Sequence, residues 1–320
     1  MVPTLLELSL ERTAEAVARV QRLEDPFLEF FTLHWRGQVV CQAGDFEERR
    51  ERIEAMGLLA ARLNQPMLTW VHHIRGVETA LIEGDVELAE RAAATALEIG
   101  TAGGQPDAGF IYGAQLLVVY RMRGALADLK DVLTEMATTT PSVAGIISGA
   151  LAVAGVEQGQ HDEARERVES FLAKDTQDTM HPAWIFGLLW HAEAAIELAE
   201  PAFAQPLFDA LTPFAGQWAS AGALIESPIN HYLGGLATVL GRNEEAEGFL
   251  ARSLIQSEEA GAKFFTAQTE LLLGRLNAKR NAPGDLERAR RLLEKVQSVS
   301  TEAGYRAVQQ RAADALASLR

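Results

Sequence analysis

Residues 84–100 read Gly-Asp-Val-Glu-Leu-Ala-Glu-Arg-Ala-Ala-Ala-Thr-Ala-Leu-Glu-Ile-Gly. Gly84 and Asp85 form a turn signal, because an Asp at the start of a helix can accept hydrogen bonds from the exposed amides of the first turn. Small and apolar residues then recur every three or four positions, which is the spacing of one buried helix face. Since another apolar run, 66–83, precedes the turn, the stretch predicts two helices joined tightly.

This pattern of helix A, tight turn and helix B returns about every forty residues. Successive turns are 40, 40, 35, 40, 42 and 43 residues apart. The turns are Gly44-Asp45-Phe46, Gly84-Asp85-Val86, Gly124-Ala125-Leu126, Gly159-Gln160-His161, Ala199-Glu200-Pro201, Gly241-Arg242-Asn243 and Gly284-Asp285-Leu286. Such a period is typical of stacked helical repeats. We therefore predict an all-α fold, a right-handed α-solenoid of about seven helix pairs with capping helices.

Aligned positions of the repeats predict how the helices pack. Five residues after each turn anchor stand Arg49, Ala89, Leu129, Ala164, Ala204, Ala246 and Ala289. The frequent Ala indicates that helix B crosses helix A closely at this position. Seven residues before the anchor, Gly37 and Gly234 predict a second point of close approach, and Gly274 is a displaced counterpart in the last repeat.

The repeats account for nearly every stretch, so we expect a single repeat domain over residues 1–320. We expect an N-terminal capping helix over 4–24, repeats over 26–304 and a C-terminal capping helix over 305–320. Pro residues and Gly mark the ends of the units, for example at His181-Pro182. Residues 216–227 are the most irregular stretch, and we expect them to pack along the surface.

Composition and charge restrict the function. The net charge of −15 argues against a nucleic-acid partner, because such a protein needs Lys and Arg to neutralise phosphates. From Phe264 onward, ten basic residues stand against six acidic ones, which indicates either a solvated basic face or a docking site for an acidic partner. The single cysteine, Cys41, cannot form an internal disulfide. With no signal peptide and no membrane-spanning run, we expect a cytoplasmic protein without a membrane partner.

Gly-Asp-x-x-x-Ala at the helix junction, with a small residue in helix A, resembles the tetratricopeptide repeat, although these units are longer. They are similar to the extended repeats of MalT- and LuxR-type ATPase regulators, and more closely to the C-terminal helical region of actinobacterial class III adenylate or guanylate cyclases and LuxR-type regulators. The segments that carry this likeness are mainly 208–216, 230–234, 240–247, 259–262, 282–285 and 287–289. The resemblance implies a signalling role. The sequence lacks the family's cyclase domain, phosphate loop and helix-turn-helix, so the catalytic and DNA-binding residues of that family have no counterparts.

The motifs that would indicate catalysis or metal binding are incomplete in this sequence. No His-Glu-x-x-His pattern occurs, and His191-x-Glu193 is only half of a zinc-deaminase signature, so we expect no metal and no cofactor. Ser148 stands one position too late in the sequence to match the Gly-x-Ser-x-Gly nucleophile elbow, and it lies on a predicted helix. We therefore interpret it as a small residue that allows close helix packing. Cys41 has no evident base. We therefore expect no enzyme activity, and an unrecognised active site in the groove is the alternative.

Helix A carries most of the large polar and aromatic residues. In tetratricopeptide arrays the A helices line the concave surface, and Tyr and Trp are enriched where proteins bind. The candidate contacts are His34, Gln38, Trp70, Arg75, Glu78, Tyr112, Gln115, Trp190, Glu193, His231 and Tyr232. Packing in the seams between helices is the competing interpretation of each residue.

The preferred hypothesis is a non-enzymatic scaffold or regulatory module that captures a peptide, a protein segment or a small effector in its concave groove. Glu78 and Glu193 would offer charge to a basic group of the ligand. The alternative is that the array is the sensor arm of a larger cyclase or ATPase signalling protein.

Overall fold

The computed structural model describes residues 5–173 and 183–319. Within this part of the chain it contains 16 α-helices and one two-stranded β-hairpin, so the all-α, solenoid-like prediction is confirmed. The helix-ending signal at His181-Pro182 lies outside the described residues. The chain divides into two compact units, and the single-domain organisation stays a prediction.

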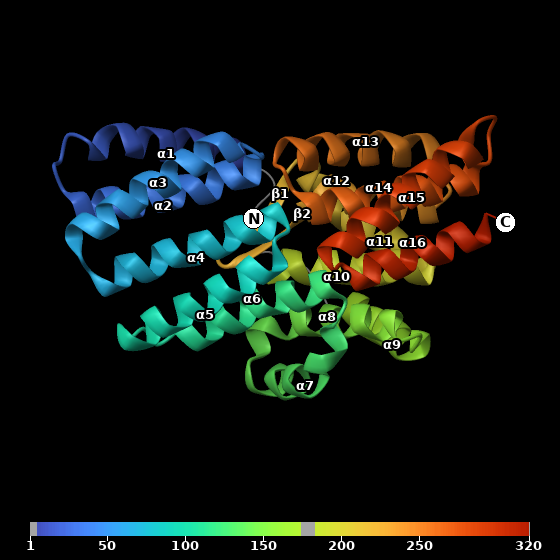
Figure 1. Ribbon diagram of the computed structural model, residues 1–320, viewed down its shortest axis with the longest axis horizontal. Helices are drawn as coiled ribbons and strands as arrows, with labels where there is room; N and C mark the ends of the chain where they lie inside the picture. The colour runs from blue at the N-terminus through green and yellow to red at the C-terminus, as the bar shows by residue number, and fades with distance from the viewer. Residues whose placement is uncertain (1–4, 174–182, 320) are drawn as a thin grey trace. The chain divides into compact units, whose positions relative to one another are not determined.

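The first unit comprises residues 1–119 and 217–226 (Figure 1). Its elements are α1 (Leu6–Val20), α2 (Pro26–Ala43), α3 (Phe46–Leu63), α4 (Pro66–Glu83), α5 (Val86–Ala102), most of α6 (Ala108–Arg123), β1 (Trp218–Ala221) and the greater part of β2 (Leu224–Pro228). Helix α1 packs on α2 as a cap, and α2 pairs with α3 as α4 pairs with α5.

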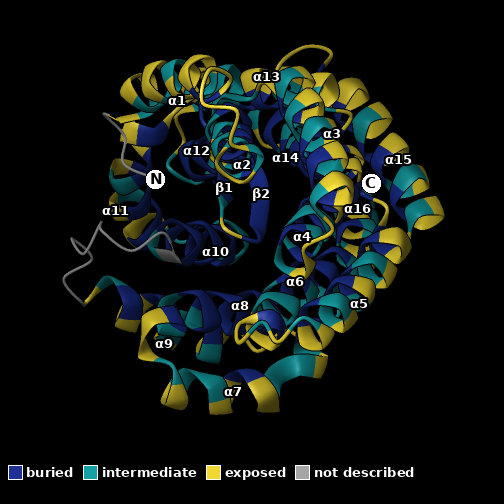
Figure 2. Ribbon diagram, turned by 90° about the vertical axis from the view of Figure 1, so that its left-hand side faces the viewer, coloured by how far each residue is buried: buried dark blue, intermediate teal, exposed yellow. Residues whose placement is uncertain are grey.

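The second unit comprises residues 120–216 and 227–320. Its α-helices are α7 (Lys130–Thr139), α8 (Ala144–Glu157), α9 (His161–Leu172), α10 (Ala183–Leu198), α11 (Pro201–Leu211), α12 (Ile229–Val239), α13 (Asn243–Glu259), α14 (Lys263–Arg280), α15 (Asp285–Ala303) and α16 (Arg306–Ser318). Short 3-10 turns lie at 126–129, 141–143 and 212–214. The even-numbered helices from α2 to α14 are the A helices, and α16 caps the array. Figure 2 shows α10 and α12 almost wholly buried, whereas α13 and α15 keep an exposed side.

The predicted turns explain why the A helices from α2 to α12 stop, whereas α14 ends at Arg280 before the left-handed Asn281, and Gly284 is the N-cap of α15. All seven turn anchors have left-handed backbone angles, with φ of 83° at Gly44, 76° at Gly84, 64° at Gly124, 72° at Gly159, 54° at Ala199, 75° at Gly241 and 84° at Gly284. This conformation ends a helix and favours glycine, because a Cβ atom is strained there. Asp45 and Asp85 then cap the following helices, each accepting a backbone hydrogen bond at 2.9 Å.

The predicted packing columns are confirmed with two exceptions. The five Ala residues of the first column are fully buried. Arg49 takes the Ala position in the first repeat and reaches Glu78 on α4 instead. A Cβ added at Gly234 would lie 2.5 Å from Leu250, and one at Gly274 would lie 2.8 Å from Leu293. At Gly37 the close-approach prediction is wrong, because an added Cβ would meet Arg52 only at 3.9 Å.

The surface prediction for residues 216–227 is wrong. These residues form most of the β-hairpin, and Trp218, Ser220, Ile225 and Glu226 are fully buried. Gly222, with φ of 63°, sits at the turn between the strands. An apolar run, a glycine and a second apolar run were the hairpin signal in the sequence. Because both strands have consecutive buried residues, alternation of polar and apolar positions could not reveal them.

No single helix among the described residues is long and apolar enough to cross a membrane. One pair of segments, Leu126–Thr139 and Pro141–Glu157, passes that test only together, and it is bent by 120° at the break.

Replacing Ala199 by glycine should remove backbone strain. Ala199→Gly should raise the free energy of unfolding by about 0.5–1 kcal/mol, because the left-handed conformation penalises Cβ more than the flexibility of Gly costs in the unfolded chain. Gly159→Ala is the reverse change at an equivalent turn with no atom within 4 Å of the added Cβ. It should lower the stability by about 1 kcal/mol. Denaturant unfolding measures both, and equal effects of the same sign would contradict this assignment.

Candidate functional site

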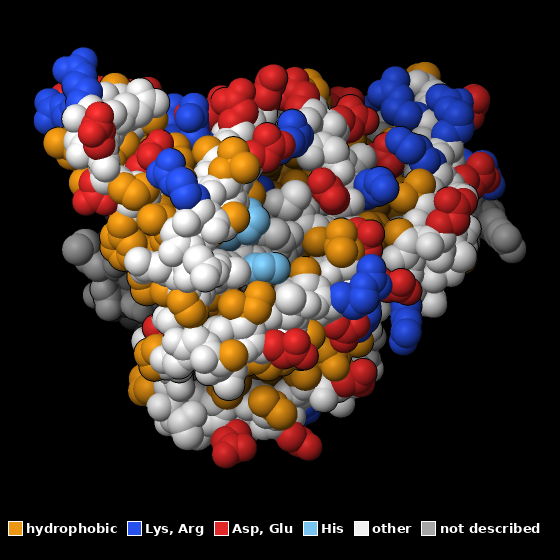
Figure 3. Space-filling model, turned by 60° about the vertical axis from the view of Figure 1, so that its left-hand side comes forward, with side chains coloured by type: hydrophobic (Ala, Val, Ile, Leu, Met, Phe, Trp, Pro, Cys, Tyr) orange, Lys and Arg blue, Asp and Glu red, His pale blue; other side chains and the backbone are white. Residues whose placement is uncertain are grey.

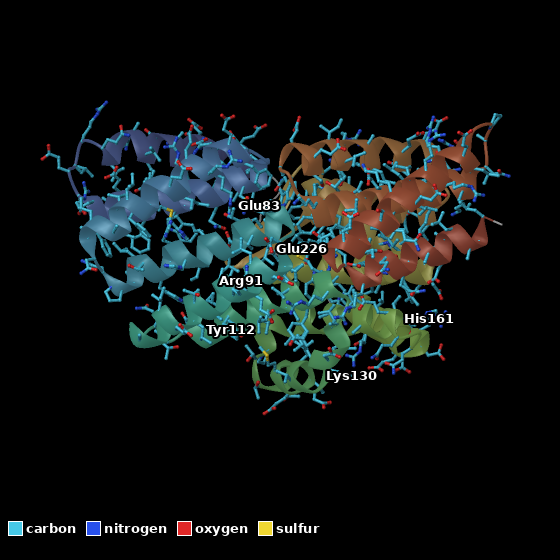
Figure 4. The ribbon with its side chains drawn as sticks, in the orientation of Figure 1. Glu83, Arg91, Tyr112, Lys130, His161 and Glu226 are labelled. Atoms are coloured by element: carbon cyan, nitrogen blue, oxygen red, sulfur yellow. The ribbon has the colours of Figure 1, made fainter. Side chains whose placement is uncertain are left out.

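The structure buries most of the residues predicted to line a groove. Nine of the eleven candidates are buried, namely Gln38, Trp70, Arg75, Glu78, Gln115, Trp190, Glu193, His231 and Tyr232. His34 and Tyr112, the latter labelled on α6 in Figure 4, are partly buried. The first unit holds the seven candidates up to Gln115 and the second unit holds the other four. Their role in binding a ligand stays a prediction, and their neighbours in each unit define what they can do.

In the second unit, Glu193 lies between two arginines. Arg121 Nη2 donates to Glu193 Oε2 at 2.5 Å, and Arg311 Nη1 donates to Glu193 Oε1 at 2.9 Å. Burial opposes ionisation of Glu193, but the two guanidinium groups outweigh it and hold the pKa of the carboxyl at about 2. Glu193 is therefore a structural anion rather than a general acid, because a proton donor needs a pKa near the working pH.

The ionic cluster around Glu193 extends to two further carboxylates. Arg275 Nη1 donates to Glu197 Oε1 at 2.7 Å. Arg311 lies 3.6 Å from Glu197 and 3.6 Å from Glu157. Three carboxylates thus face three guanidinium groups. Burial raises the pKa of Glu157 to about 7, although Arg311 acts in the opposite direction.

Aromatic side chains enclose the charged groups. The guanidinium carbon of Arg121 lies 6.0 Å from the Trp190 ring centroid and 5.5 Å from that of Phe264. Arg121 also reaches the Tyr232 hydroxyl at 3.5 Å. His231 hydrogen bonds to Thr269 at 3.1 Å, and burial lowers the pKa of this imidazole to about 4. The predicted groove residues of the second unit therefore have partners among other residues of the same unit.

Arg311 gives the second unit a contact that a simple stack of repeats lacks. In such a stack each repeat touches only its neighbours. Here α16, the last helix, reaches back to Glu193 on α10 and Glu157 on α8. A Cβ added at Gly124 would lie 2.6 Å from the backbone nitrogen of Ala307, so the start of the second unit also meets α16. Helix α16 therefore contacts both the first residues and the middle helices of the second unit.

The first unit also buries charge on its A helices. Arg75 Nη1 lies 2.6 Å from Glu78 Oε1, and Arg49 Nη2 donates to Glu78 Oε2 at 3.1 Å. Two arginines thus share one carboxylate. Burial, aided by the charge of Arg75, lowers the pKa of His34 to about 3. His34 is therefore neutral at physiological pH, and burial also keeps the Cys41 thiol protonated by raising its pKa.

The hairpin is docked on the A helices of the first unit. Gln42 Nε2 on α2 donates to the Ser220 carbonyl at 3.1 Å, and the Ser220 hydroxyl opposes the rise in the pKa of the Cys41 thiol on the same helix. The Trp218 ring meets Phe46 edge-on at 4.7 Å. Near the hairpin turn, Ala223 packs in one cluster with Trp70 and Ile74 of α4 and Ala108 of α6. We call this surface, formed by Cys41, Gln42, Phe46, Trp70, Ile74 and Ala108, the hairpin seat.

Helix α2 continues beyond the hairpin seat as an exposed aromatic stripe. Phe27, Phe31 and Trp35 are spaced four residues apart and so lie on one helix face. Trp35 is 61% exposed and Phe27 is 40% exposed. Trp35 also stands seven residues, about two turns, before Gln42, so the stripe and the hairpin contact share a face. Figure 3 shows exposed hydrophobic side chains gathered together on part of one face of the molecule.

Other features of the described residues bear on possible chemistry. Ser148 Oγ lies 3.2 Å from His191 Nε2, but His191 is buried, and Phe171 stacks on its ring at 3.9 Å. No group of three or more His, Cys, Asp or Glu side chains is placed to hold a metal there. A surface cavity of about 490 Å³ lies among α14, α15 and α16, and Arg275 is the member of the ionic cluster that lines it.

Sequence reasoning missed several residues that organise these sites. Arg121 and Arg311 were not selected, because Arg121 stands at the end of its A helix and Arg311 lies in the stretch predicted as a C-terminal cap. Ser220 and Trp218 lie in the stretch that lacked a repeat pattern. An arginine within an apolar helical run, as at Arg121, was the available signal, since such a charge needs a buried partner.

No model of a known protein family matches this chain, and no curated protein matches it either. The likeness to tetratricopeptide and MalT-type repeats therefore stays a resemblance carried by the residues quoted above.

Glu157 should make stability depend on pH. Its pKa is raised from 4.5 to about 7 in the folded chain. The stability associated with its protonated form is therefore fully present below the unfolded pKa and is lost as the pH rises through 7. Glu157→Gln should remove this loss, so its stability relative to the wild type should be about 2 kcal/mol greater at pH 8 than at pH 5. Denaturant unfolding at both pH values measures the difference.

The matched control is Glu166→Gln, which neutralises an exposed carboxylate on α9. It should change stability by a similar small amount at both pH values. If Glu157→Gln behaves as this control does, Glu157 is not a strained buried acid.

Proposed function

We propose that this protein is a non-enzymatic regulatory binding module of the cytoplasm that captures an extended segment of a protein partner on the A-helix face of its first unit. The observation that supports this proposal most is the docked hairpin. Its strand β1 lies against α2, and Ala223, at the turn between the strands, packs with residues of α4 and α6. A face that holds one extended segment has the spacing, the apolar area and the polar groups to hold another.

The aromatic stripe of α2 supplies the exposed part of the proposed binding face. Trp and Phe contribute large apolar areas with few rotatable bonds, and Trp is enriched among residues that dominate binding energies. His34 contributes an uncharged edge, because its ring meets Trp35 at a centroid distance of 5.1 Å while its pKa is low. An apolar or aromatic side chain of the partner would bury itself here.

The A helices of the second unit support a different role. Arg121 and Arg311 both pair with Glu193 there, so a ligand would have to break buried ion pairs to reach these groups. Breaking such a pair costs about 3–5 kcal/mol. We therefore assign the second unit to rigidity and the first to recognition. A small effector, or a role as the arm of a larger signalling protein, stays an alternative that rests on the repeat resemblance alone.

Capture of a protein partner should depend on Trp35. The full chain, immobilised and exposed to an extract from its own source, should retain a partner identifiable by mass spectrometry. Trp35→Ala should reduce that retention about tenfold or more, because hot-spot aromatic residues contribute 2 kcal/mol or more to binding. The ion current of the retained protein measures the effect.

Leu58→Ala is the matched control, because Leu58 is 76% exposed but lies on α3, a B helix. It should leave retention unchanged. Equal retention by the wild type and Trp35→Ala, or an equal loss in both variants, would contradict the assignment of the binding face to α2.

A further inference from the structure

Two surface cavities of the second unit lie at opposite ends of α14. One, of about 490 Å³, lies where α14 ends, among α14, α15 and α16, which pack on one another (Figure 1). The other, of about 280 Å³, lies where α14 begins, among α13, α14 and α15. Pockets for small molecules typically measure about 300–1,000 Å³. The larger cavity therefore has the size to hold one small ligand.

The charges that line these two cavities differ. The smaller cavity is lined by two lysines and two glutamates, namely Lys263, Lys295, Glu258 and Glu270. Its formal charges balance. Arg275 and Lys279 line the larger cavity, and none of the described residues that line it is acidic. The larger cavity is thus the one with an excess of positive charge.

Lys279 is the cation of the larger cavity that a ligand can neutralise. Arg275 already has a counter-charge, because its Nη1 donates to Glu197 Oε1 at 2.7 Å. Lys279 Nζ donates to the Thr238 carbonyl oxygen at 2.6 Å and forms no ion pair with a carboxylate of the described residues. An ammonium group has three donors, so this bond leaves two for a ligand. One positive charge without a counter-ion matches a ligand with one negative charge.

The acidic residues nearest to the cavity along these helices have partners elsewhere. Asp285 accepts two hydrogen bonds from Arg280, at 2.7 and 2.9 Å. Glu287 pairs with an arginine one turn later on α15. Asp314 accepts a bond at 2.9 Å from a glutamine one turn earlier on α16. None of these three carboxylates lines the cavity, so the charge of Lys279 is not answered from its own surroundings.

The remainder of the cavity wall is largely apolar. Leu286 of α15 lines it together with Ala278, Ala315 and Leu319. Leu286 is 47% exposed, so a ligand that covers it removes apolar surface from water. Such burial is favourable in proportion to the area covered. A cation beside an exposed leucine is suited to a ligand that carries its charge at one end of a hydrocarbon chain.

We propose that the cavity among α14, α15 and α16 binds a small amphipathic carboxylate, with its anionic group on Lys279 and its hydrocarbon part against Leu286. The site contains no residue of α2, so it is separate from the proposed partner-binding face. Arg275 of α14 and Arg311 of α16 both belong to the ionic cluster around Glu193. A ligand that contacts both helices therefore stabilises the closed arrangement of the second unit.

Isothermal titration calorimetry of the full chain with octanoate tests this site, because octanoate carries one carboxylate on an unbranched alkyl chain. Octanol keeps the chain and lacks the charge, and it should bind at least about tenfold more weakly. Acetate keeps the charge and lacks the long chain, and it should also bind at least about tenfold more weakly. Inorganic phosphate should bind no more tightly than acetate does.

Three variants locate the bound carboxylate. Lys279→Met should weaken octanoate binding about tenfold, because a hydrogen bond to a charged group is lost. Lys263→Met is the matched control, since it removes the same charge from the other end of α14, and it should leave binding unchanged. Leu286→Ser should weaken binding about fivefold, because it removes part of the apolar wall. Saturating octanoate should also raise the stability of the wild type and not that of Lys279→Met.

Denaturant unfolding checks that the variants are folded, and Leu286→Ser decides the matter if Lys279→Met does not unfold cooperatively. The proposal is wrong if octanoate does not bind, if octanol binds as tightly, or if Lys279→Met and Lys263→Met weaken binding equally. Trp35→Ala should leave octanoate binding unchanged, and a loss there would place the ligand on α2 instead. Partner capture that depends on Trp35 and carboxylate binding that depends on Lys279 can each fail without the other, so the two proposals are judged separately.

Discussion

The second unit depends on the charge of Glu193, held between Arg121 and Arg311. A buried carboxylate without a partner would cost far more than this fold can supply, and a pair of guanidinium groups reverses that cost. Because Arg311 comes from α16 and Glu193 from α10, the same pairing ties these two distant helices together. Helices that would otherwise touch only their neighbours are joined across several repeats, and their inner face becomes a closed, charge-paired core.

The first unit uses the same kind of helix pair and arrives at a different surface. Its inner arginines, Arg49 and Arg75, share Glu78, and a hairpin supplied from a later part of the chain covers the adjoining apolar area. The two units differ in what covers the inner face, which is a hairpin in the first and paired charges in the second. The repeats share their type of turn and most of the Ala column, and these positions fix how the helices pack. The residues of the inner face are therefore free to differ between repeats. Function is expected where the inner face is not closed by the helices of its own repeats.

The sequence predicts the repeat well because its signals are local. A left-handed turn needs glycine, and a close helix crossing needs Ala, so Gly84 and Ala89 report on their own surroundings. The candidate site was harder to predict. Helix periodicity shows that Glu193 and Tyr232 share the inner face, but the curvature of the array decides whether that face is open, and curvature depends on distant residues such as Arg311. The hairpin eluded prediction for a related reason, since the helices that bury it lie far away in sequence.

The central claim is that the inner face of the first unit is covered by a two-stranded hairpin, which is marginally stable by itself, whereas that of the second unit is closed by ion pairs between its own helices. Native-state hydrogen exchange, resolved by residue, tests this most directly, because it measures the free energy of opening for each amide. The account predicts that the amides of β1 and β2 exchange through a local opening that is easier than global unfolding, while those of α10 and α12 exchange only with global unfolding. Equal protection of the hairpin and of these two helices would contradict it.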